Sequence, residues 1–243
     1  VYEIPEGQRV SRGRGLLNFL DISPEDKILC LRTLSKKDQE QGVKYLVMAT
    51  KNGMIKKTPL RDFDNIRKSG LIAISLKKGD ELKNVQKTTG RDDIIFATKK
   101  GQTIRFSEKE VRSMGRTAAG IKGIRLKKGD AVAAMDVIRV GDERQSHLLL
   151  VTETGFGKRT ELKEFKLQRR GGSGIKAINA NPKIGDLIAA KAVGEEEDLI
   201  IISQKAHVVR IKIGQISKLS RSAQGVKLIR LEPGDKVASA ACI

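Results

Sequence analysis

The sequence predicts an all-β protein, a propeller-like disc of blades with four strands each. Three sequence markers recur in one order about every fifty residues along the 243-residue chain. The apolar runs between them are four to six residues long and rich in Val, Ile and Leu, which favours strands over buried helices. Because a single four-stranded unit cannot bury its own faces, we expect consecutive units to stack on one another.

The first marker is a basic stretch that ends on a glycine and leads into an apolar run. It occurs in RVSRGRGLLNFL, IRKSGLIAISL, RSMGRTAAGIKGIRL, QRRGGSGIKAI and LSRSAQGVKLIRL. The glycines that end the basic stretches are spaced 55, 50, 54 and 51 residues apart and are Gly15, Gly70, Gly120, Gly174 and Gly225. Each basic stretch is predicted to be an exposed link between strands.

The other two markers are turns. A hairpin with a short polar turn precedes each of the four later glycines, as in YLVMATKNGMIKKTPL and LLLVTETGFGKRT. A Gly-Asp pair follows each of them, and the pairs are Gly79-Asp80, Gly129-Asp130, Gly185-Asp186 and Gly234-Asp235. Glycine adopts positive φ without a Cβ clash, and Asp tolerates similar conformations, so these pairs suit hairpin turns.

The markers divide the chain into four complete repeats and one partial repeat. The complete repeats are 45–93, 94–147, 148–198 and 199–243, and the partial one is 1–44. Val1–Ile4 matches the second strand of the hairpin, without the first strand. We therefore expect a single domain that is a fragment of a longer chain.

Charge predicts the partner. The chain has 48 Lys plus Arg against 29 Asp plus Glu, a formal net charge of +19, which favours a polyanion. Aromatic residues make up only 3%, and single-strand binding uses aromatic stacking, so duplex DNA is the expected ligand. No membrane contact is expected, and Cys30 and Cys242 are interpreted as buried thiols of a cytoplasmic protein.

No catalytic, nucleotide or metal site is predicted. Residues 115–120 nearly match a Walker A loop, but Ile121 stands at the lysine position and the segment leads into a predicted strand. His147 and His207 lie in or beside turns, without a partner at a metal-ligand spacing, and are expected on the surface. No cofactor is therefore expected in this domain.

The predicted binding site is a curved track of cations at equivalent positions of the repeats. Arginine offers a planar fork to phosphate oxygens, and glycine lets backbone N–H groups approach phosphate closely. Non-specific phosphate contacts supply about 5–8 kcal/mol, against about 1–6 kcal/mol for bending about 20–30 bp. The predicted contacts are Arg9, Arg12, Arg14, Arg67, Lys68, Arg112, Arg116, Lys122, Arg169, Arg170, Lys176, Lys218, Arg221 and Lys227.

Several segments resemble one family, the C-terminal domain of the DNA gyrase A subunit, which is part of a type IIA topoisomerase. They are VRSMGRTAAGIKGIRL (111–126), TGFGKRTELKEF (154–165), QRRGGSG (168–174) and AQGVKLIRL (223–231), and the resemblance covers essentially the whole chain. It implies a six-bladed β-pinwheel, with strands exchanged between blades, that wraps duplex DNA around its rim. It also implies an enzyme that introduces negative supercoils, while the catalytic tyrosine belongs to another domain.

The same resemblance implies partners and a location. The partners are the gyrase B subunit together with the remainder of the gyrase A subunit, in an A2B2 assembly, with ATP and Mg²⁺ used by other parts of the enzyme. The location is the bacterial cytoplasm, in association with the nucleoid.

QRRGGSG resembles the DNA-wrapping box of the family, a QRRGGKG-type heptad. The residues carried over are Gln168, Arg169, Arg170, Gly171, Gly172, Ser173 and Gly174. Ser173 replaces a lysine, and the family's box lies in the first blade whereas this heptad lies in a late one, so a related rim contact is expected. Two alternatives stay open: the equivalent domain of the topoisomerase IV A subunit, which binds DNA crossings, and a non-enzymatic blade-repeat module that binds proteins.

Overall fold

The structure, a computed structural model, confirms the all-β prediction. It describes residues 8, 12, 15, 23, 25, 28–33, 35, 38, 40–65 and 70–243. Within these residues the strands are β1 (Tyr45–Thr50), β2 (Met54–Pro59), β3 (Leu82–Thr88), β4 (Asp93–Thr98), β5 (Gln102–Ser107), β6 (Ile121–Lys122), β7 (Val132–Ile138), β8 (His147–Thr152), β9 (Phe156–Glu161), β10 (Ile175–Lys176), β11 (Leu187–Val193), β12 (Asp198–Ser203), β13 (Val208–Lys212), β14 (Val226–Lys227) and β15 (Val237–Cys242). Short 3₁₀ helices follow the second strand of each hairpin, and they are η2 (Leu60–Phe63), η3 (Glu108–Glu110), η4 (Leu162–Glu164) and η5 (Ile213–Gln215).

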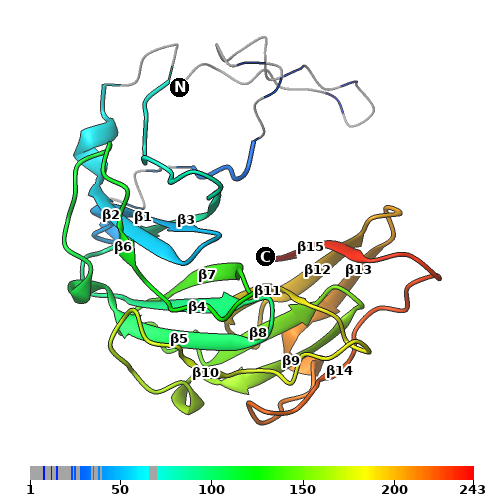
Figure 1. The fold of residues 1–243 in the computed structure, drawn as a ribbon. Helices are drawn as coiled ribbons and strands as arrows, with labels where there is room; N and C mark the ends of the chain where they lie inside the picture. Colours follow the sequence, from blue (N-terminus) through cyan, green and yellow to red (C-terminus); the bar gives the residue numbers. More distant parts are fainter. Residues whose placement is uncertain are drawn as a thin grey trace.

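The described strands form four antiparallel sheets arranged along an arc (Figure 1). From the inside of the arc outward, the strand orders are β3-β1-β2-β6 in the first sheet, β7-β4-β5-β10 in the second, β11-β8-β9-β14 in the third and β15-β12-β13 in the fourth. The inner strands β3, β7, β11 and β15 come close to one another in sequence order. The sheets are therefore stacked like blades around a common centre.

The outer strand of each four-stranded sheet comes from the following repeat. β6 pairs with β2 through Met54↔Lys122 and Ile55↔Ile121. β10 pairs with β5 and β14 pairs with β9 in the same way. The repeat pattern alone placed this strand in the same blade as the hairpin before it, and that placement is wrong. The exchange between blades that the resemblance implies is confirmed.

The apolar core lies between neighbouring sheets. Ile55, Phe96, Phe106 and Ile124 belong to one buried cluster, which joins the first sheet to the second. Two further clusters join the second sheet to the third and the third to the fourth. Because these side chains are buried by the next sheet and by the donated strand, no blade holds its core alone, and burial of apolar area binds the repeats together.

The Gly-Asp turns support the adjacent hairpin turns. All four glycines have positive φ, from +70° to +77°. In the first sheet the Asp80 carboxylate accepts hydrogen bonds from Thr50 Oγ1 at 2.6 Å and from the Asn52 backbone N–H at 2.9 Å. Asp130 and Asp235 accept the equivalent backbone bonds from Lys100 and Lys205. In these three sheets the marker Asp therefore satisfies donors that a polar turn leaves free.

Candidate nucleic-acid interface

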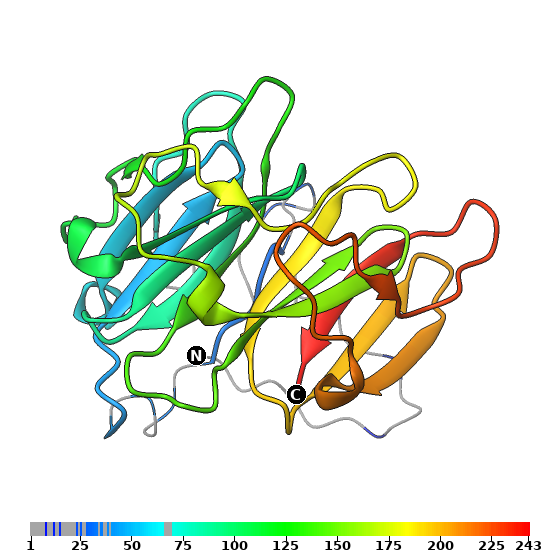
Figure 2. The ribbon, with the colours of Figure 1, turned by 90° about the horizontal axis from the view of Figure 1, so that it is seen from below.

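Three links run along the outside of the arc, each from a 3₁₀ helix to a donated strand. They are residues 111–120, 165–174 and 216–225, leading from η3 to β6, from η4 to β10 and from η5 to β14. Figure 2 shows the links crossing from their own sheet to the outer edge of the preceding one. The outer edge is therefore made of the segments that the sequence singled out as basic.

The glycines that end the links have a packing role. A β-carbon on Gly120 would lie 2.5 Å from the carbonyl oxygen of Ile55, and one on Gly174 would lie 2.5 Å from that of Thr103. Gly225 meets the carbonyl oxygen of Gly157 at 2.6 Å in the same way. All three have positive φ. Their lack of a side chain lets the donated strand reach the acceptor strand, whereas the sequence suggested an approach to phosphate.

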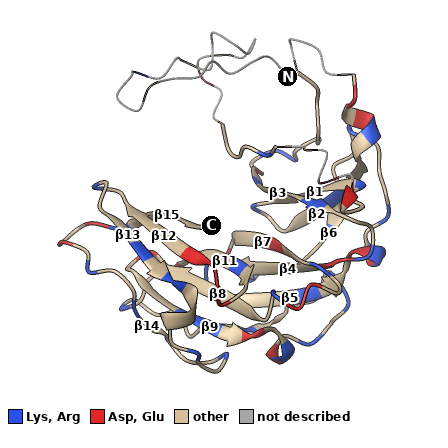
Figure 3. Ribbon diagram, turned by 180° about the vertical axis from the view of Figure 1, so that it is seen from behind, with Lys and Arg blue, Asp and Glu red and all other residues tan. Residues whose placement is uncertain are grey.

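The second position of each donated strand holds an exposed lysine. Ile121 and Ile175 are half-buried, while their neighbours Lys122 and Lys176 are exposed. Lys227, at the third equivalent position, is exposed and lies 5.6 Å from the centre of the Phe156 ring. The predicted placement of these three lysines at equivalent points of the outer edge is therefore seen. Figure 3 shows Lys and Arg in the outer strands and in the segments beyond them.

The other predicted contacts differ in exposure. Exposed side chains are those of Arg12, Arg112, Arg169, Ser173 and Lys218. Half-buried residues are Arg116, Gln168, Arg170, Gly171, Gly172, Gly174 and Arg221. Arg9, Arg14, Arg67 and Lys68 lie outside the described residues.

Arg170 and Arg221 join one link to the preceding one. The Arg170 guanidinium donates to the backbone oxygens of Glu110 at 3.0 Å and Lys122 at 3.1 Å. Arg221 donates to the backbone oxygen of Lys176 at 3.2 Å, and its own N–H donates to the Glu164 carboxylate. These arginines hold neighbouring repeats in position, whereas Arg169 remains exposed to solvent.

The heptad itself is held by its main chain. Gly171 has a φ of +77°, and its N–H donates to the Gly123 carbonyl at 2.6 Å. The Gly172 carbonyl accepts from the Arg125 N–H at 2.8 Å. A β-carbon on Gly172 would touch the side chain of Ile104 at 3.5 Å. The positive φ of Gly171 favours glycine there, and the heptad lies beside Ile104 of the second sheet with Arg169 exposed.

Two buried lysines hold the other two links, and sequence reasoning missed them. Lys158 Nζ donates to the backbone oxygens of Ser220 at 2.5 Å and Arg221 at 2.6 Å. Lys56 Nζ donates to those of Arg116 and Ala73. Both side chains are fully buried, and burial lowers the pKa of each to about 8. Their shared position in the second hairpin strand was the available signal.

Sequence reasoning also missed a group of exposed lysines that come just before the Gly-Asp turns. The Gly-Asp turns of the first two sheets are each preceded by two exposed lysines, Lys77-Lys78 and Lys127-Lys128. In the third sheet one exposed lysine remains, Lys183, and in the fourth the place is taken by Glu232 and Pro233. The repeated KKGD was the signal in the sequence.

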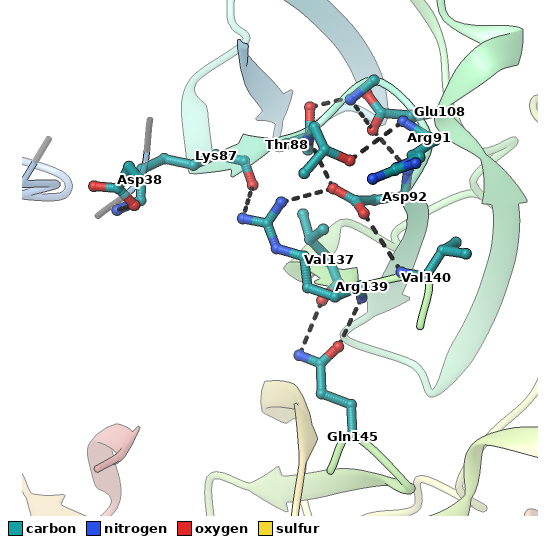
Figure 4. Close-up of polar contacts among 12 residues, drawn as sticks. Asp38, Lys87, Thr88, Arg91, Asp92, Glu108, Val137, Arg139, Val140 and Gln145 are labelled. Carbon is teal, nitrogen blue, oxygen red and sulfur yellow. Dashed lines mark hydrogen bonds and ion pairs between the residues drawn. The ribbon is translucent and has the colours of Figure 1, made fainter. Parts of the chain in front are cut away.

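Charges between the first two sheets, away from the links, are paired with one another. Arg139 donates to the Asp92 carboxylate at 2.7 Å and to the Lys87 carbonyl at 2.8 Å (Figure 4). The buried Glu108 carboxylate accepts from Thr88 Oγ1 and from the N–H groups of Gly90 and Asp92. These contacts join the first sheet to the second and leave little free charge for a ligand.

The expectations that His147 lies on the surface and that both cysteines are buried are wrong. His147 is buried, with 5% exposure, because it begins the central strand β8. Burial and then the nearby Arg159 lower its pKa. Cys30 is exposed and Cys242 is half-buried, where burial raises the pKa of the thiol to about 12.

The described part of the chain has no group of three or more His, Cys, Asp or Glu placed to hold a metal ion. Nor does any helix there have the length and apolar character needed to cross a membrane.

Stacked antiparallel sheets with outer strands exchanged between repeats and exposed lysines on the outer edge define a propeller-like class of all-β domain. The family model of the DNA gyrase C-terminal domain, a beta-propeller, matches residues 44–89, 92–139, 146–193 and 197–243. The chain therefore belongs to the DNA gyrase C-terminal domain family.

Curated relatives include the DNA gyrase A subunit of Staphylococcus epidermidis, 40% identical over 240 residues, which cover 99% of this chain and 26% of that protein. The DNA gyrase A subunit of Haloquadratum walsbyi is 39% identical over 98% of this chain and 28% of its own length. The chain thus spans about a quarter of the length of these relatives.

Solved structures with the same fold include the C-terminal domain of DNA topoisomerase IV, with a TM-score of 0.84 and 26% identity over 95% of this chain and 70% of that one. The C-terminal domain of DNA gyrase A has a TM-score of 0.79 and 23% identity over 94% of this chain and 74% of that one.

Proposed function

We propose that this chain binds duplex DNA without sequence specificity along its outer edge and wraps it, as part of the A subunit of a DNA gyrase. In this proposal the wrap presents DNA to a type IIA topoisomerase that introduces negative supercoils with ATP hydrolysed on a partner subunit. The A2B2 assembly would contain the remainder of the A subunit together with the B subunit, in the bacterial cytoplasm.

One observation carries the proposal: exposed cations recur at equivalent points of an edge that follows an arc of stacked sheets. Lys122, Lys176 and Lys227 occupy the same position of successive donated strands. Phosphates repeat along a duplex whatever its sequence, so a periodic edge of this kind suits the backbone and not the bases. A curved edge contacts more phosphates when the duplex bends with it.

The turn lysines extend this surface. Arg125 and the pair Lys127-Lys128 come shortly after Lys122 in the chain, beyond two buried residues, so exposed cations recur between the outer edge and the turns. We propose that the duplex lies over both groups at the first two sheets and over the outer edge alone at the third. The charge of the turns, which falls from Lys77-Lys78 to Glu232, supports this path.

Binding in rising salt tests the phosphate contacts. With six to ten phosphates neutralised, duplex affinity should fall about 10³–10⁵-fold between about 50 and 200 mM salt. Gel mobility of a duplex labelled at one end measures this. An affinity that does not depend on salt would contradict the proposal and favour a module that binds proteins.

Trapped topology tests wrapping. A nicked circle resealed in the presence of the chain should keep a net change in linking number, read on an agarose gel after the protein is removed. Binding without such a change would contradict wrapping.

A second candidate is the equivalent domain of the topoisomerase IV A subunit, favoured by the TM-score of 0.84 to the C-terminal domain of DNA topoisomerase IV. The 40% identity to a gyrase A subunit over nearly the whole chain favours gyrase. Full-length enzyme assembled with its ATPase subunit distinguishes the two, since gyrase activity gives negatively supercoiled circles and topoisomerase IV activity gives only relaxed or decatenated ones.

A further inference from the structure

The fourth sheet has a different hairpin turn from the other three. Gly53, Gly101 and Gly155 occupy equivalent turn positions with φ between +82° and +84°. The equivalent residue of the fourth sheet is Ala206, with a φ of +64°, and it is the one non-glycine residue with positive φ within the described ranges. An L-residue with a side chain is strained in this conformation, so the alanine is not explained by the turn alone.

The three glycines lie against the donated strands. A β-carbon on Gly101 would be 2.5 Å from the carbonyl oxygen of Ile178, and one on Gly155 would be 2.8 Å from that of Ile229. A β-carbon on Gly53 would be 2.9 Å from the carbonyl oxygen of Ile124. Ile124, Ile178 and Ile229 follow β6, β10 and β14 and are nearly fully buried. A side chain at the turn is therefore incompatible with a donated strand in this register.

We infer that Ala206 prevents the fourth sheet from accepting a donated strand in the register that the other three sheets use. In the part of the chain that the structure describes, β13 has no outer neighbour, so the series of donated strands with exposed lysines ends at β14. If the proposed wrapping is correct, the duplex leaves the continuous track at this sheet.

The composition of β13 suits a free edge. Its exposure alternates between exposed and half-buried, and Val208 is 61% exposed, whereas every residue of β9 is buried or half-buried. Arg210 and Lys212 are exposed on it. Charged side chains on an edge strand oppose pairing with other chains, so these residues protect a strand that is left open.

Hydrogen exchange of the longest natural form of the chain, without DNA, tests this inference independently of DNA binding. We expect the amides of Val208–Lys212 that are not bonded to β12 to exchange as fast as exposed loops, while the equivalent amides of β9 stay protected. Protection of β13 equal to that of β9 would overturn the inference.

Two matched variants test the role of the alanine. Gly155→Ala places the same side chain in the third sheet and should remove the protection of β14 and of the outer amides of β9. Gly129→Ala is the control, because it adds the same side chain at a φ of +76° with nothing within 4 Å, and it should leave β14 and β9 protected. Full protection of β9 in Gly155→Ala, or an equal loss of protection in Gly129→Ala, would show that this β-carbon does not decide strand acceptance.

Discussion

The link over the second sheet and the link over the third sheet have the same topology and are held by different chemistry. Residues 216–225 are held by the buried ammonium of Lys158, which donates to two carbonyls. At the equivalent point of the second sheet stands Ile104, and residues 165–174 lie on it through Gly171 and Gly172. At this link an aliphatic side chain and main-chain hydrogen bonds therefore take the place of the buried cation.

This difference assigns a structural reason to the heptad QRRGGSG. With no lysine beneath it, the link satisfies two of its backbone groups with neighbouring backbone, namely the Gly171 N–H and the Gly172 carbonyl. Arg170 is used to join the repeats, and Arg169 is the exposed arginine. Of the two arginines of the heptad, Arg169 is thus the one that is left exposed and available to a ligand.

The largest effect is expected where both links share a requirement, at the glycine that ends them. Gly174→Ala combines a strained φ with a carbonyl at 2.5 Å and should lower the free energy of unfolding by about 2–5 kcal/mol. Gly129→Ala is the control, since its φ is +76° but nothing lies within 4 Å of the added carbon. Urea denaturation measures both, and equal losses would contradict the packing role.

Removing the buried lysine should destabilise one link and leave the other unchanged. Lys158→Met leaves the carbonyls of Ser220 and Arg221 without their donor and should cost about 1–3 kcal/mol. Ile104→Met keeps an apolar floor and should cost less than about 1.5 kcal/mol. Amide exchange in residues 216–225 should rise only in the lysine variant; a rise in neither would show that the ammonium does not hold this link.

The Lys158 and Ile104 variants should also differ in how their stability depends on pH. Burial lowers the pKa of Lys158 from 10.5 to about 8, so between these values the unfolded chain binds the proton and the folded chain does not. Stability therefore rises with pH across this window, by at most about 1.4 kcal/mol per pH unit for each such lysine. Lys158→Met should flatten the rise measured by urea denaturation from pH 8 to 10, and Ile104→Met should not.

The smallest effect on stability is expected at the exposed arginine of the heptad. Arg169→Ala should leave the free energy of unfolding unchanged and reduce the salt slope of duplex binding by about one. Arg170→Ala, in contrast, should lower the free energy of unfolding by about 1 kcal/mol, because it breaks two hydrogen bonds to backbone oxygens. Identical behaviour of the two variants would contradict the division of the heptad into a DNA-facing and a structural arginine.

Periodicity was enough to predict the strands, their turns and the outward lysines. Lys122, Lys176 and Lys227 follow a half-buried or exposed aliphatic residue in each donated strand, and this alternation is visible in one dimension. The role of Arg170 was not visible, because its partners Glu110 and Lys122 lie 60 and 48 residues away. His147 was misplaced for a related reason, since its burial comes from strands on both sides of β8.

By itself the sequence determined the all-β class, the fifty-residue period and the sign of the charge, because each depends on composition and short-range pattern. Only the tertiary structure decided which sheet each donated strand joins. That choice depends on a close backbone approach at Gly120, Gly174 and Gly225, and on contacts between distant repeats. A strand of two residues has too few side chains to specify its partner, so the fit of backbone against backbone makes the selection.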